Sequence, residues 1–249
     1  MRRYGIGWAA VATAALWCVD AFAADLPDLP PADIYVLGER HDNPDHHVMQ
    51  GALIARIAPT AIVLEMLTDE QAERLDPDTP RDPQVLNTLF DWADMGWPPI
   101  ADYMPIFTAS TAPILGAAGA PGDLTSYGLD DPLDSAEQTA RETLQADAHC
   151  GVLPADLLPR FVARQREMDA QFAARTLAAF DLYGGPVVLI AGNGHARSDW
   201  GVPAAIGRVR PGVTVVSVVQ GEGGRTPPGG DIVLDAPEPQ RPDPCDAFR

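Results

Sequence analysis

The sequence predicts an α/β fold: a mostly parallel central sheet flanked by helices, with helical insertions that cap the carboxyl ends of the strands. Three observations predict it. Short, unbroken runs of apolar and β-branched residues are typical of strands buried on both faces. Segments with the apolar spacing of helices separate these runs, so strands and helices alternate along the chain. Within residues 24–249 neither an internal repeat nor a linker interrupts the alternation, which predicts one domain.

The first strand–helix–strand unit is the clearest. Residues 34–37 and 61–64 are apolar runs of strand length. Between them, Asn43 and Pro44 predict the start of a helix, because Asn is a good N-cap and Pro suits the first helical position. Apolar residues follow with helical spacing until Pro59 ends the segment. We expect the two strands to form a right-handed parallel pair.

The rest of the chain continues the alternation. Residues 119–134 are rich in Gly, Pro and Asp and are expected to form a loop. The helical segments between 68 and 112 and between 135 and 182 are long relative to the strands, so we expect them to cover the sheet. Helices are expected at about residues 69–76, 82–95, 102–110, 135–147 and 155–182, and strands at 114–118, 187–191, 213–219 and 232–234.

Composition and charge exclude several classes of function. The 249 residues include 17 basic and 35 acidic side chains, for a formal net charge of −18, and every basic residue is Arg. Without Lys there is no Schiff base with pyridoxal phosphate and no phosphate-binding loop ending in Gly-Lys-Ser/Thr. The acidic balance argues against nucleic acid as a partner, because phosphate contacts need a basic face. An anionic ligand would need a local cluster of arginines.

The first 23 residues differ from the rest of the chain. Two arginines precede an apolar run at residues 8–17, and Ala21-Phe22-Ala23 supplies the small residues of a cleavage site. This pattern predicts a secretory signal peptide at residues 1–23, cleaved near Ala23, and export to the periplasm. The run is too short to span a membrane, which takes ~20 apolar residues. An N-terminal core helix is the alternative.

Cysteine use agrees with export. Cys18 raises the question of a lipoprotein anchor, but Trp17 stands where such a cleavage site needs a small residue, so we do not expect acylation. The predicted mature chain keeps Cys150 and Cys245, and an even count in an exported protein predicts a disulfide. Such a bridge would fix the proline-rich C-terminal tail. Two unpaired thiols are the alternative.

Polar side chains follow three of the predicted strands. Gly38-x-x-His41 and Gly192-x-x-His195 end two of them, and Glu65 ends a third. Because ligands bind at the carboxyl ends of parallel strands, we expect His41, Glu65 and His195 to converge. Two imidazoles and a carboxylate form a ligand set for a divalent metal, or serve as general acid and base without one. A structural hydrogen bond is the alternative for each His.

Neighbouring residues add less specific signals. His46 and His47 lie in the first turn of the helix after His41, and either could turn toward the same cleft; a solvated helix start is the alternative, which we favour for His47. The Gly-rich segment at 192–194 does not match a dinucleotide site, because Gly-x-Gly-x-x-Gly is absent. A serine-based triad is not expected, since no Gly-x-Ser-x-Gly elbow occurs.

From about residue 33 to residue 249, the chain resembles the ChaN-like haem-binding uptake family of the Tiki superfamily. Two long motifs are the most specific part of the resemblance, and shorter ones agree with it. The motifs are Gly38-Glu39-Arg40-His41-Asp42-Asn43-Pro44 with His46-His47 and Gln50, Glu65-Met66, Trp97-Pro98 with Tyr103-x-Pro105, His149-Cys150-Gly151, Gln165-Arg166 with Asp169, Gly192-Asn193-Gly194-His195-Ala196-Arg197-x-Asp199-x-Gly201-Val202-Pro203, and Asp243-Pro244-Cys245.

The resemblance implies an exported protein that binds haem in haem or iron uptake. A homodimer that holds haem at its interface is one arrangement that the resemblance implies. Haem needs an axial ligand, apolar walls and cations for its propionates. Tyr103 is our first candidate for the axial ligand, with His41, His46 and His195 as alternatives. The candidates for the propionates are Arg40, Arg166 and Arg197, of which Arg166 fits surface pairing with acids better.

A second function is open at the same residues. The wider superfamily includes Tiki-type metalloproteases and erythromycin-esterase-like hydrolases, which share the arrangement that falls here on His41, Glu65 and His195. In a metal-dependent hydrolase these three would hold a divalent metal such as zinc and activate a bound water. Glu39, Asp42 or His46 would then serve as general base.

Overall fold

A computed structural model describes residues 26–119, 123–243 and 245–246. The expected signal peptide, its cleavage site at Ala23 and Cys18 lie outside these residues. In the described part of the chain, no helix is long and apolar enough to cross a membrane.

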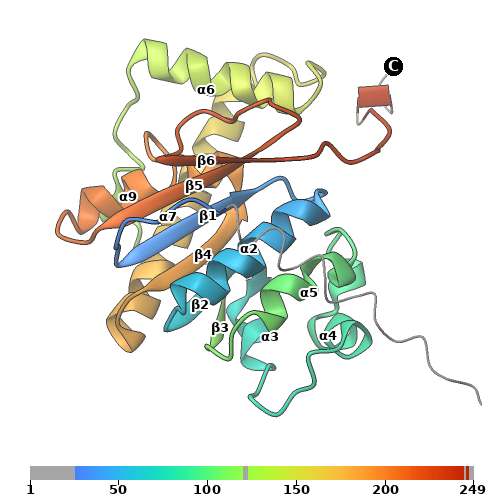
Figure 1. The fold of residues 1–249 in the computed structure, drawn as a ribbon. Coiled ribbons are helices and arrows are strands. Elements are labelled where there is room, and N and C mark those ends of the chain that lie inside the picture. The colour runs from blue at the N-terminus through green and yellow to red at the C-terminus, as the bar shows by residue number, and fades with distance from the viewer. Residues whose placement is uncertain (1–25, 120–122, 244, 247–249) are drawn as a thin grey trace, which may run out of the picture.

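The centre of the protein is a sheet of six strands, all parallel, which confirms the predicted fold class (Figure 1). The strand order is β3-β2-β4-β1-β5-β6. The inner strands are almost fully buried, as their unbroken apolar runs predict. The strands are β1 (Ile34–Glu39), β2 (Ala61–Thr68), β3 (Ile114–Ala118), β4 (Val187–Gly192), β5 (Val215–Glu222) and β6 (Ile232–Ala236).

The expected direct pairing of the first two strands is wrong. β1 and β2 are parallel, but β4 lies between them and pairs with both. All six residues of β4 are buried, which fits a position with neighbours on both edges and helices on both faces. At one edge, β6 alternates half-buried and exposed residues, which suits a strand paired on one side only.

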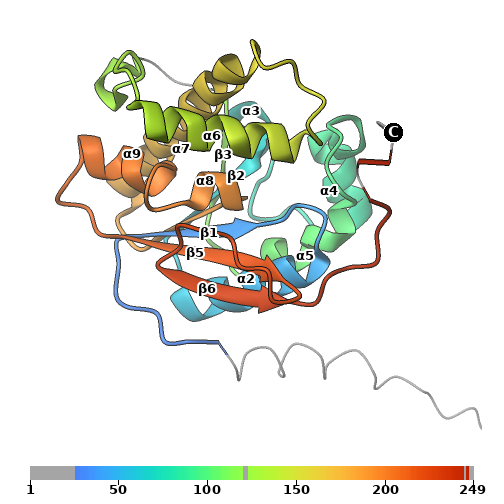
Figure 2. The same ribbon diagram turned by 90° about the horizontal axis from the view of Figure 1, so that it is seen from above.

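Helices cover both faces of the sheet (Figure 2). On one face α2 packs with α5, and on the other α7 packs with α9 and α6. The first half of α7 and α6 extend over the carboxyl ends of the strands, as expected for the second helical insertion. The helices are α2 (Pro44–Ile57), α3 (Asp69–Glu73), α4 (Pro83–Phe90), α5 (Ile100–Thr108), α6 (Ser135–Ala148), α7 (Leu158–Tyr183), α8 (Asn193–Ala196) and α9 (Val202–Val209), with 3₁₀ turns at Trp92–Asp94 and Thr125–Tyr127.

Strand alternation decides which polar residues reach which face. Leu37 of β1 belongs to the core under α2 and α5, whereas Val63 of β2 belongs to the core under α7 and α9. Because successive side chains alternate, Glu39 follows Leu37 to the first face and Glu65 follows Val63 to the second. Two carboxylates therefore leave the carboxyl end of the sheet on opposite sides of it.

Local signals explain most element boundaries. The side chain of Asn43 accepts the backbone N–H of Asp45, which confirms the predicted N-cap of α2. The helix expected at 82–95 ends at Phe90, because Asp91 adopts the left-handed conformation with φ 54°. The sequence analysis missed the short helices α8 and α9. Within α9 the buried residues are Val202, Pro203 and Ile206, too short a run to give a clear helical period.

A disulfide joins Cys150, in the loop after α6, to Cys245, which confirms the predicted bridge. The tail between β6 and Cys245 runs past the carboxyl ends of the strands (Figure 1). On its way Arg241 pairs with Glu222, at the end of β5, and with Asp42. The bridge holds the tail near the C-terminus, and this ion pair holds it between β6 and the bridge.

Breaking the disulfide should lower the free energy of unfolding by about 4 kcal/mol in the chain-entropy account, because the bridge closes a long loop. Cys150→Ser and Cys245→Ser should each show the loss in denaturant unfolding. The double variant should lose no more than either single variant. Peptide mapping without reductant should recover Cys150 linked to Cys245; free thiols at both positions in the oxidised protein would contradict the bridge.

Candidate functional site

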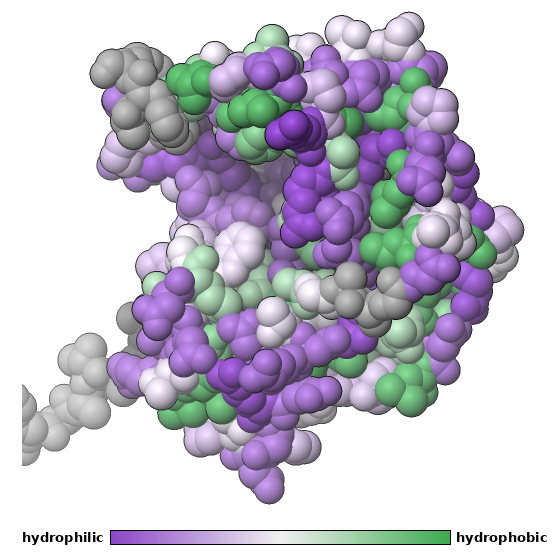
Figure 3. All heavy atoms as spheres, turned by 180° about the vertical axis from the view of Figure 1, so that it is seen from behind, coloured by the Kyte–Doolittle hydropathy of each residue, from purple (hydrophilic) through white to green (hydrophobic). Residues whose placement is uncertain are grey.

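A cleft of about 620 Å³ lies at the carboxyl ends of β1 and β4, beneath α6 and the start of α7. This volume lies within the ~300–1,000 Å³ of small-molecule and cofactor sites. The surface is deeply hollowed when the molecule is seen from behind (Figure 3). Polar residues at the cleft are Glu39, Arg40, His41, Arg141, His195 and Arg197, and apolar ones are Leu144, Ala148, Val162, Trp200, Pro227 and Pro228.

Glu39 is a buried carboxylate at the end of β1, with 2% of its surface exposed. Its Oε1 accepts Nδ1–H of His41 at 2.7 Å and the hydroxyl of Tyr103 at 3.1 Å. Its Oε2 lies 3.6 Å from Nε2 of His47. Burial raises the pKa of Glu39, but the contacts with His41 and His47 outweigh it and lower that pKa to about 2. Glu39 is therefore ionised and fixed at neutral pH.

His41 follows Glu39 in the turn after β1 and reaches the cleft. Its Nε2 lies 3.8 Å from Oε2 of Glu65, too far for a hydrogen bond, and 30% of its side chain is exposed. The ring packs against Trp97 at 4.8 Å between centroids. Burial lowers the pKa of His41, but the hydrogen bond to Glu39 and the charge of Glu65 raise it overall. The exposed nitrogen of His41 is thus aimed into the cleft by a carboxylate behind it.

His195, in α8 after β4, is held in the same way. Its Nδ1–H donates to Oδ1 of Asp169 on α7 at 2.7 Å, and its Nε2 lies 3.6 Å from Oε1 of Glu65. Burial lowers the pKa of His195, but the charges of Glu65 and Asp169 and the hydrogen bond to Asp169 raise it to about 9. Oε2 of Glu65 also accepts the N–H of Gly192 at 2.7 Å. A Cβ at Gly192 would lie only 3.0 Å from Nε2 of His41, so glycine lets these groups approach.

The structure brings His41, Glu65 and His195 together, each His oriented by a carboxylate at Nδ1. This arrangement also occurs around metal-bound histidines. However, within residues 26–119, 123–243 and 245–246, no group of three or more His, Cys, Asp or Glu side chains is arranged to hold a metal ion. The site therefore gives the metal-dependent hydrolase no geometric support, and the metal site stays a prediction.

Tyr103 and His46 lie outside the cleft lining. Tyr103 is fully buried below Glu39, stacked on His47 at 3.9 Å between ring centroids. Burial and the charge of Glu39 strongly raise the pKa of Tyr103, which keeps its hydroxyl protonated. In His46, Nδ1 accepts the N–H of Arg40 at 2.9 Å and Nε2 donates to the carbonyl of Gly221 at 3.0 Å. Both nitrogens of His46 are therefore used by the backbone.

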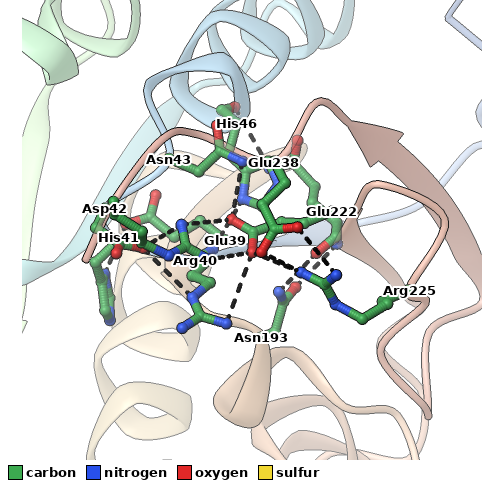
Figure 4. A network of polar contacts seen from close by, with 12 residues as sticks. Glu39, Arg40, His41, Asp42, Asn43, His46, Asn193, Glu222, Arg225 and Glu238 are labelled. Carbon is green, nitrogen blue, oxygen red and sulfur yellow. Dashed lines mark hydrogen bonds and ion pairs between the residues drawn. The ribbon is translucent and has the colours of Figure 1, made fainter. Parts of the chain in front are cut away.

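The turn that contains Arg40 and His41 is fixed by a polar network around Glu222 (Figure 4). Asn43 donates to Oε1 of Glu222 at 2.9 Å, and Nη1 of Arg40 lies 3.6 Å from Oε2. Burial raises the pKa of Glu222, but hydrogen bonds from Arg241 and Asn43 lower it overall. The network anchors the turn to β5 and to the C-terminal tail, so His41 does not depend on solvent for its position.

The three arginines named from the sequence differ in their access to the cleft. Arg40 and Arg197 line it, Arg40 about half exposed and Arg197 buried. Arg166 instead donates to the carbonyls of Gly128 and Asp131, away from the cleft. Arg40 and Arg197 are therefore in position to meet a ligand's anionic groups.

The sequence motifs include Asp169 without a role, and they include neither Arg141 nor Trp200. Asp169 lies among buried residues of α7, and an acid on the apolar face of a helix is a signal that could have been found. Arg141 and Glu137 have the ordinary i, i+4 spacing of an ion pair on a helix surface. This spacing gives no sign that the Arg141 side chain is buried. Trp200 lies in a turn between α8 and α9, where no periodicity marks it.

Together the fold and the cleft define a parallel α/β protein with a cleft at the carboxyl ends of its strands, the edge at which folds of this class bind ligands. The chain belongs to the haem-binding uptake family of the Tiki superfamily, ChaN, whose model matches residues 26–120 and 116–206. No curated protein matches the chain.

Three solved structures are similar to the chain. ChaN of Campylobacter jejuni, in a structure described as cofacial heme binding, has 22% sequence identity and a TM-score of 0.59, over 81% of this chain and 86% of that chain. The type III effector HopBA1 has 9% identity and a TM-score of 0.43, over 89% and 92% of the two chains. A succinoglycan biosynthesis protein has 12% identity and a TM-score of 0.44, over 83% and 69%. The likeness to ChaN of Campylobacter jejuni, at 22% identity, shows the fold alone.

Raising the pH should destabilise the protein through His195. The folded-state pKa is raised from 6.5 to about 9, so this stabilisation is complete below the unfolded pKa and is lost as the pH rises through 9. The loss should reach at most about 3 kcal/mol. Denaturant unfolding between pH 6 and 10 measures it.

In His195→Gln this pH dependence should be smaller than in the wild type, because the titrating ring is gone. His149→Gln, at a histidine outside the cleft lining, is the matched control and should keep the wild-type slope. An unchanged slope in His195→Gln would contradict the pairing of His195 with Asp169 and Glu65.

Proposed function

We propose that this protein is an exported haem-binding protein of haem or iron uptake, and that it holds haem in the cleft at the carboxyl ends of β1 and β4. The main observation is the state of His41. Its Nδ1 is fixed by Glu39, whereas its Nε2 faces the cleft with no hydrogen-bond partner among the described residues. An imidazole held in this way is a suitable axial ligand.

The other residues of the cleft also fit haem. Leu144, Ala148 and Val162 supply apolar contacts for a porphyrin, and arginines on the same cleft supply cations for its propionates. When bound, haem supplies an iron centre with axial coordination positions. We assign the axial position to His41, with His195 as the alternative, because 12% of the His195 side chain is exposed against 30% for His41.

Tyr103 takes a different role in this proposal. Its hydroxyl donates to Glu39 from below, and a phenolate at this position would face a buried carboxylate charge. Tyr103 is therefore a positioning residue that keeps Glu39 oriented toward His41. The first choice of axial ligand moves from Tyr103 to His41 on this geometry.

Export is supported by the composition of residues 1–23 and by the disulfide, a bond typical of oxidising compartments. Residues 24–249 would then form one haem-binding domain. Mass spectrometry of the protein recovered from the periplasm should show a chain that begins at Ala24, without an acyl group. A chain that keeps residues 1–23, or carries lipid on Cys18, would contradict this part of the proposal.

Haem titration of the purified protein should give a saturable change in the Soret band at stoichiometric haem. His41→Ala should shift the Soret maximum and weaken binding at least ~10-fold, since one axial contact is lost. Tyr103→Phe should leave the Soret maximum unchanged, because the ring and its packing stay. His149→Ala is the control outside the cleft and should bind as the wild type does.

Three results would overturn parts of the proposal. Wild-type protein without a saturable Soret change does not bind haem, and one equivalent of tightly held metal in the same sample would favour the hydrolase. A Soret shift in Tyr103→Phe but not in His41→Ala would return the axial position to Tyr103. We also propose a homodimer that covers the exposed apolar Leu144 and Val152. Light scattering during the titration should then show the mass double, and a constant monomer mass contradicts it.

A further inference from the structure

Two arginines from distant parts of the chain lie against one tryptophan at the cleft. Arg197 follows α8, and its guanidinium carbon lies 3.6 Å from the centroid of the Trp200 ring. Arg141 belongs to α6, and its guanidinium carbon lies 4.9 Å from the same centroid. All three side chains line the cleft. We call Arg141, Arg197 and Trp200 the arginine clamp.

Each arginine of the clamp is already oriented by a carboxylate of its own. Nε and Nη2 of Arg197 donate to Asp199 at 2.8 and 2.6 Å, and the same two nitrogens of Arg141 donate to Glu137. In the described part of the chain, Nη1 of each arginine has no hydrogen-bond partner. Each guanidinium therefore keeps one NH₂ group for a ligand while the rest of the group is fixed.

The two arginines of the clamp are less exposed to solvent than the carboxylates that pair with them. The Arg141 and Arg197 side chains are only 10% and 9% exposed, whereas those of Glu137 and Asp199 are 31% and 45% exposed. Water therefore screens the two carboxylates more than the two guanidinium groups. The two guanidinium charges at the cleft wall are therefore weakened less by solvent than those of their acidic partners, which favours an anion beside them.

Both guanidinium groups lie largely out of water, where an N–H donor without a partner is costly. An anion at this wall would accept hydrogen bonds from the Nη1 groups. Leu144 and Ala148 of α6 line the same cleft, so the ligand that fits is apolar over most of its surface and carries carboxylates at one edge. Planar guanidinium groups match carboxylates better than an ammonium does.

We propose that the arginine clamp binds the propionate carboxylates of the porphyrin, and that it makes the site selective for porphyrins with free carboxylates. The proposal rests on the haem-binding function proposed above. It adds Arg141 and Trp200 to the site and orients the ligand. Arg141 and Arg197 would hold the carboxylate edge of the porphyrin, and His41 or His195 would hold its iron.

The alternative is a structural role, in which Arg141 and Arg197 only hold α6 against the turn before α9 through Trp200. The two roles differ in what they predict for a porphyrin without free carboxylates. A clamp discriminates haem from haem dimethyl ester, which has the same iron and the same ring. A structural support affects the affinity for both ligands equally.

The test is a pair of Soret titrations, with haem and with haem dimethyl ester, on the wild type and on Arg141→Gln and Arg197→Gln. We expect the wild type to bind haem about 10- to 100-fold more tightly than the ester, the range for losing a hydrogen bond between charged groups. Each variant should lose affinity for haem by a similar factor and keep the wild-type affinity for the ester. The Soret maximum should not move, because neither arginine touches the iron.

Arg164→Gln is the matched control, since Arg164 is an exposed arginine of α7 paired with Glu167 and does not line the cleft. It should bind both ligands as the wild type does. Arg141→Lys should recover only part of the affinity, because it restores the charge without the planar group. Thermal unfolding of each variant shows that it is folded; if Arg141→Gln is not, the Arg197→Gln and Arg141→Lys titrations decide.

The outcomes separate this proposal from the haem-binding proposal. A wild type that binds haem and its ester equally well overturns the arginine clamp and leaves haem binding in place. Variants that lose affinity for both ligands in the same proportion also overturn it, in favour of the structural role. A wild type that binds neither ligand overturns both proposals.

Discussion

The buried charge of Glu39 is the constraint on which the site depends. A carboxylate at the end of a central strand is out of water, so protein groups must compensate it. Here they come from three elements: His41 from the turn after β1, His47 from α2 and Tyr103 from α5. The same contacts that make the charge tolerable therefore join the sheet, two helices and the turn, and they fix the ring of His41 before any ligand arrives.

The other face of the sheet repeats this solution with different residues. Asp169 of α7 holds Nδ1 of His195, as Glu39 holds Nδ1 of His41. Glu65, between the two rings, lies 3.8 Å from one Nε2 and 3.6 Å from the other. Carboxylates and imidazole rings thus hold one another in place at this end of the sheet, and their geometry follows from the strand ends. A rigid floor reduces the ordering that ligand binding would otherwise require.

The sequence predicts the parts of this site that depend on local order. Gly38-x-x-His41 and Gly192-x-x-His195 place their histidines at strand ends, and parallel strands bring such ends together. The sequence does not predict the hydrogen-bond partners of these side chains, because the partners depend on packing between distant elements. A tyrosine at position 103 could be a haem ligand or a buried core residue. Only the approach of α5 to Glu39, which buries the side chain and makes its hydroxyl a donor to Glu39, distinguishes the two roles. The position of β4 between β1 and β2 is likewise set by burial across the whole sheet.

Arg141 shows why net charge was a poor guide to the ligand. A chain with a formal charge of −18 repels anions at long range, but salt screens exposed charges beyond roughly 10 Å. Inside the cleft the sign of the potential depends on which member of each ion pair is buried. Glu137 and Asp199 point toward water, and their arginines lie at the cleft. An acidic surface and arginines at the cleft wall are therefore compatible. Solvent weakens the field of the exposed carboxylates, whereas burial preserves the field of the guanidinium groups.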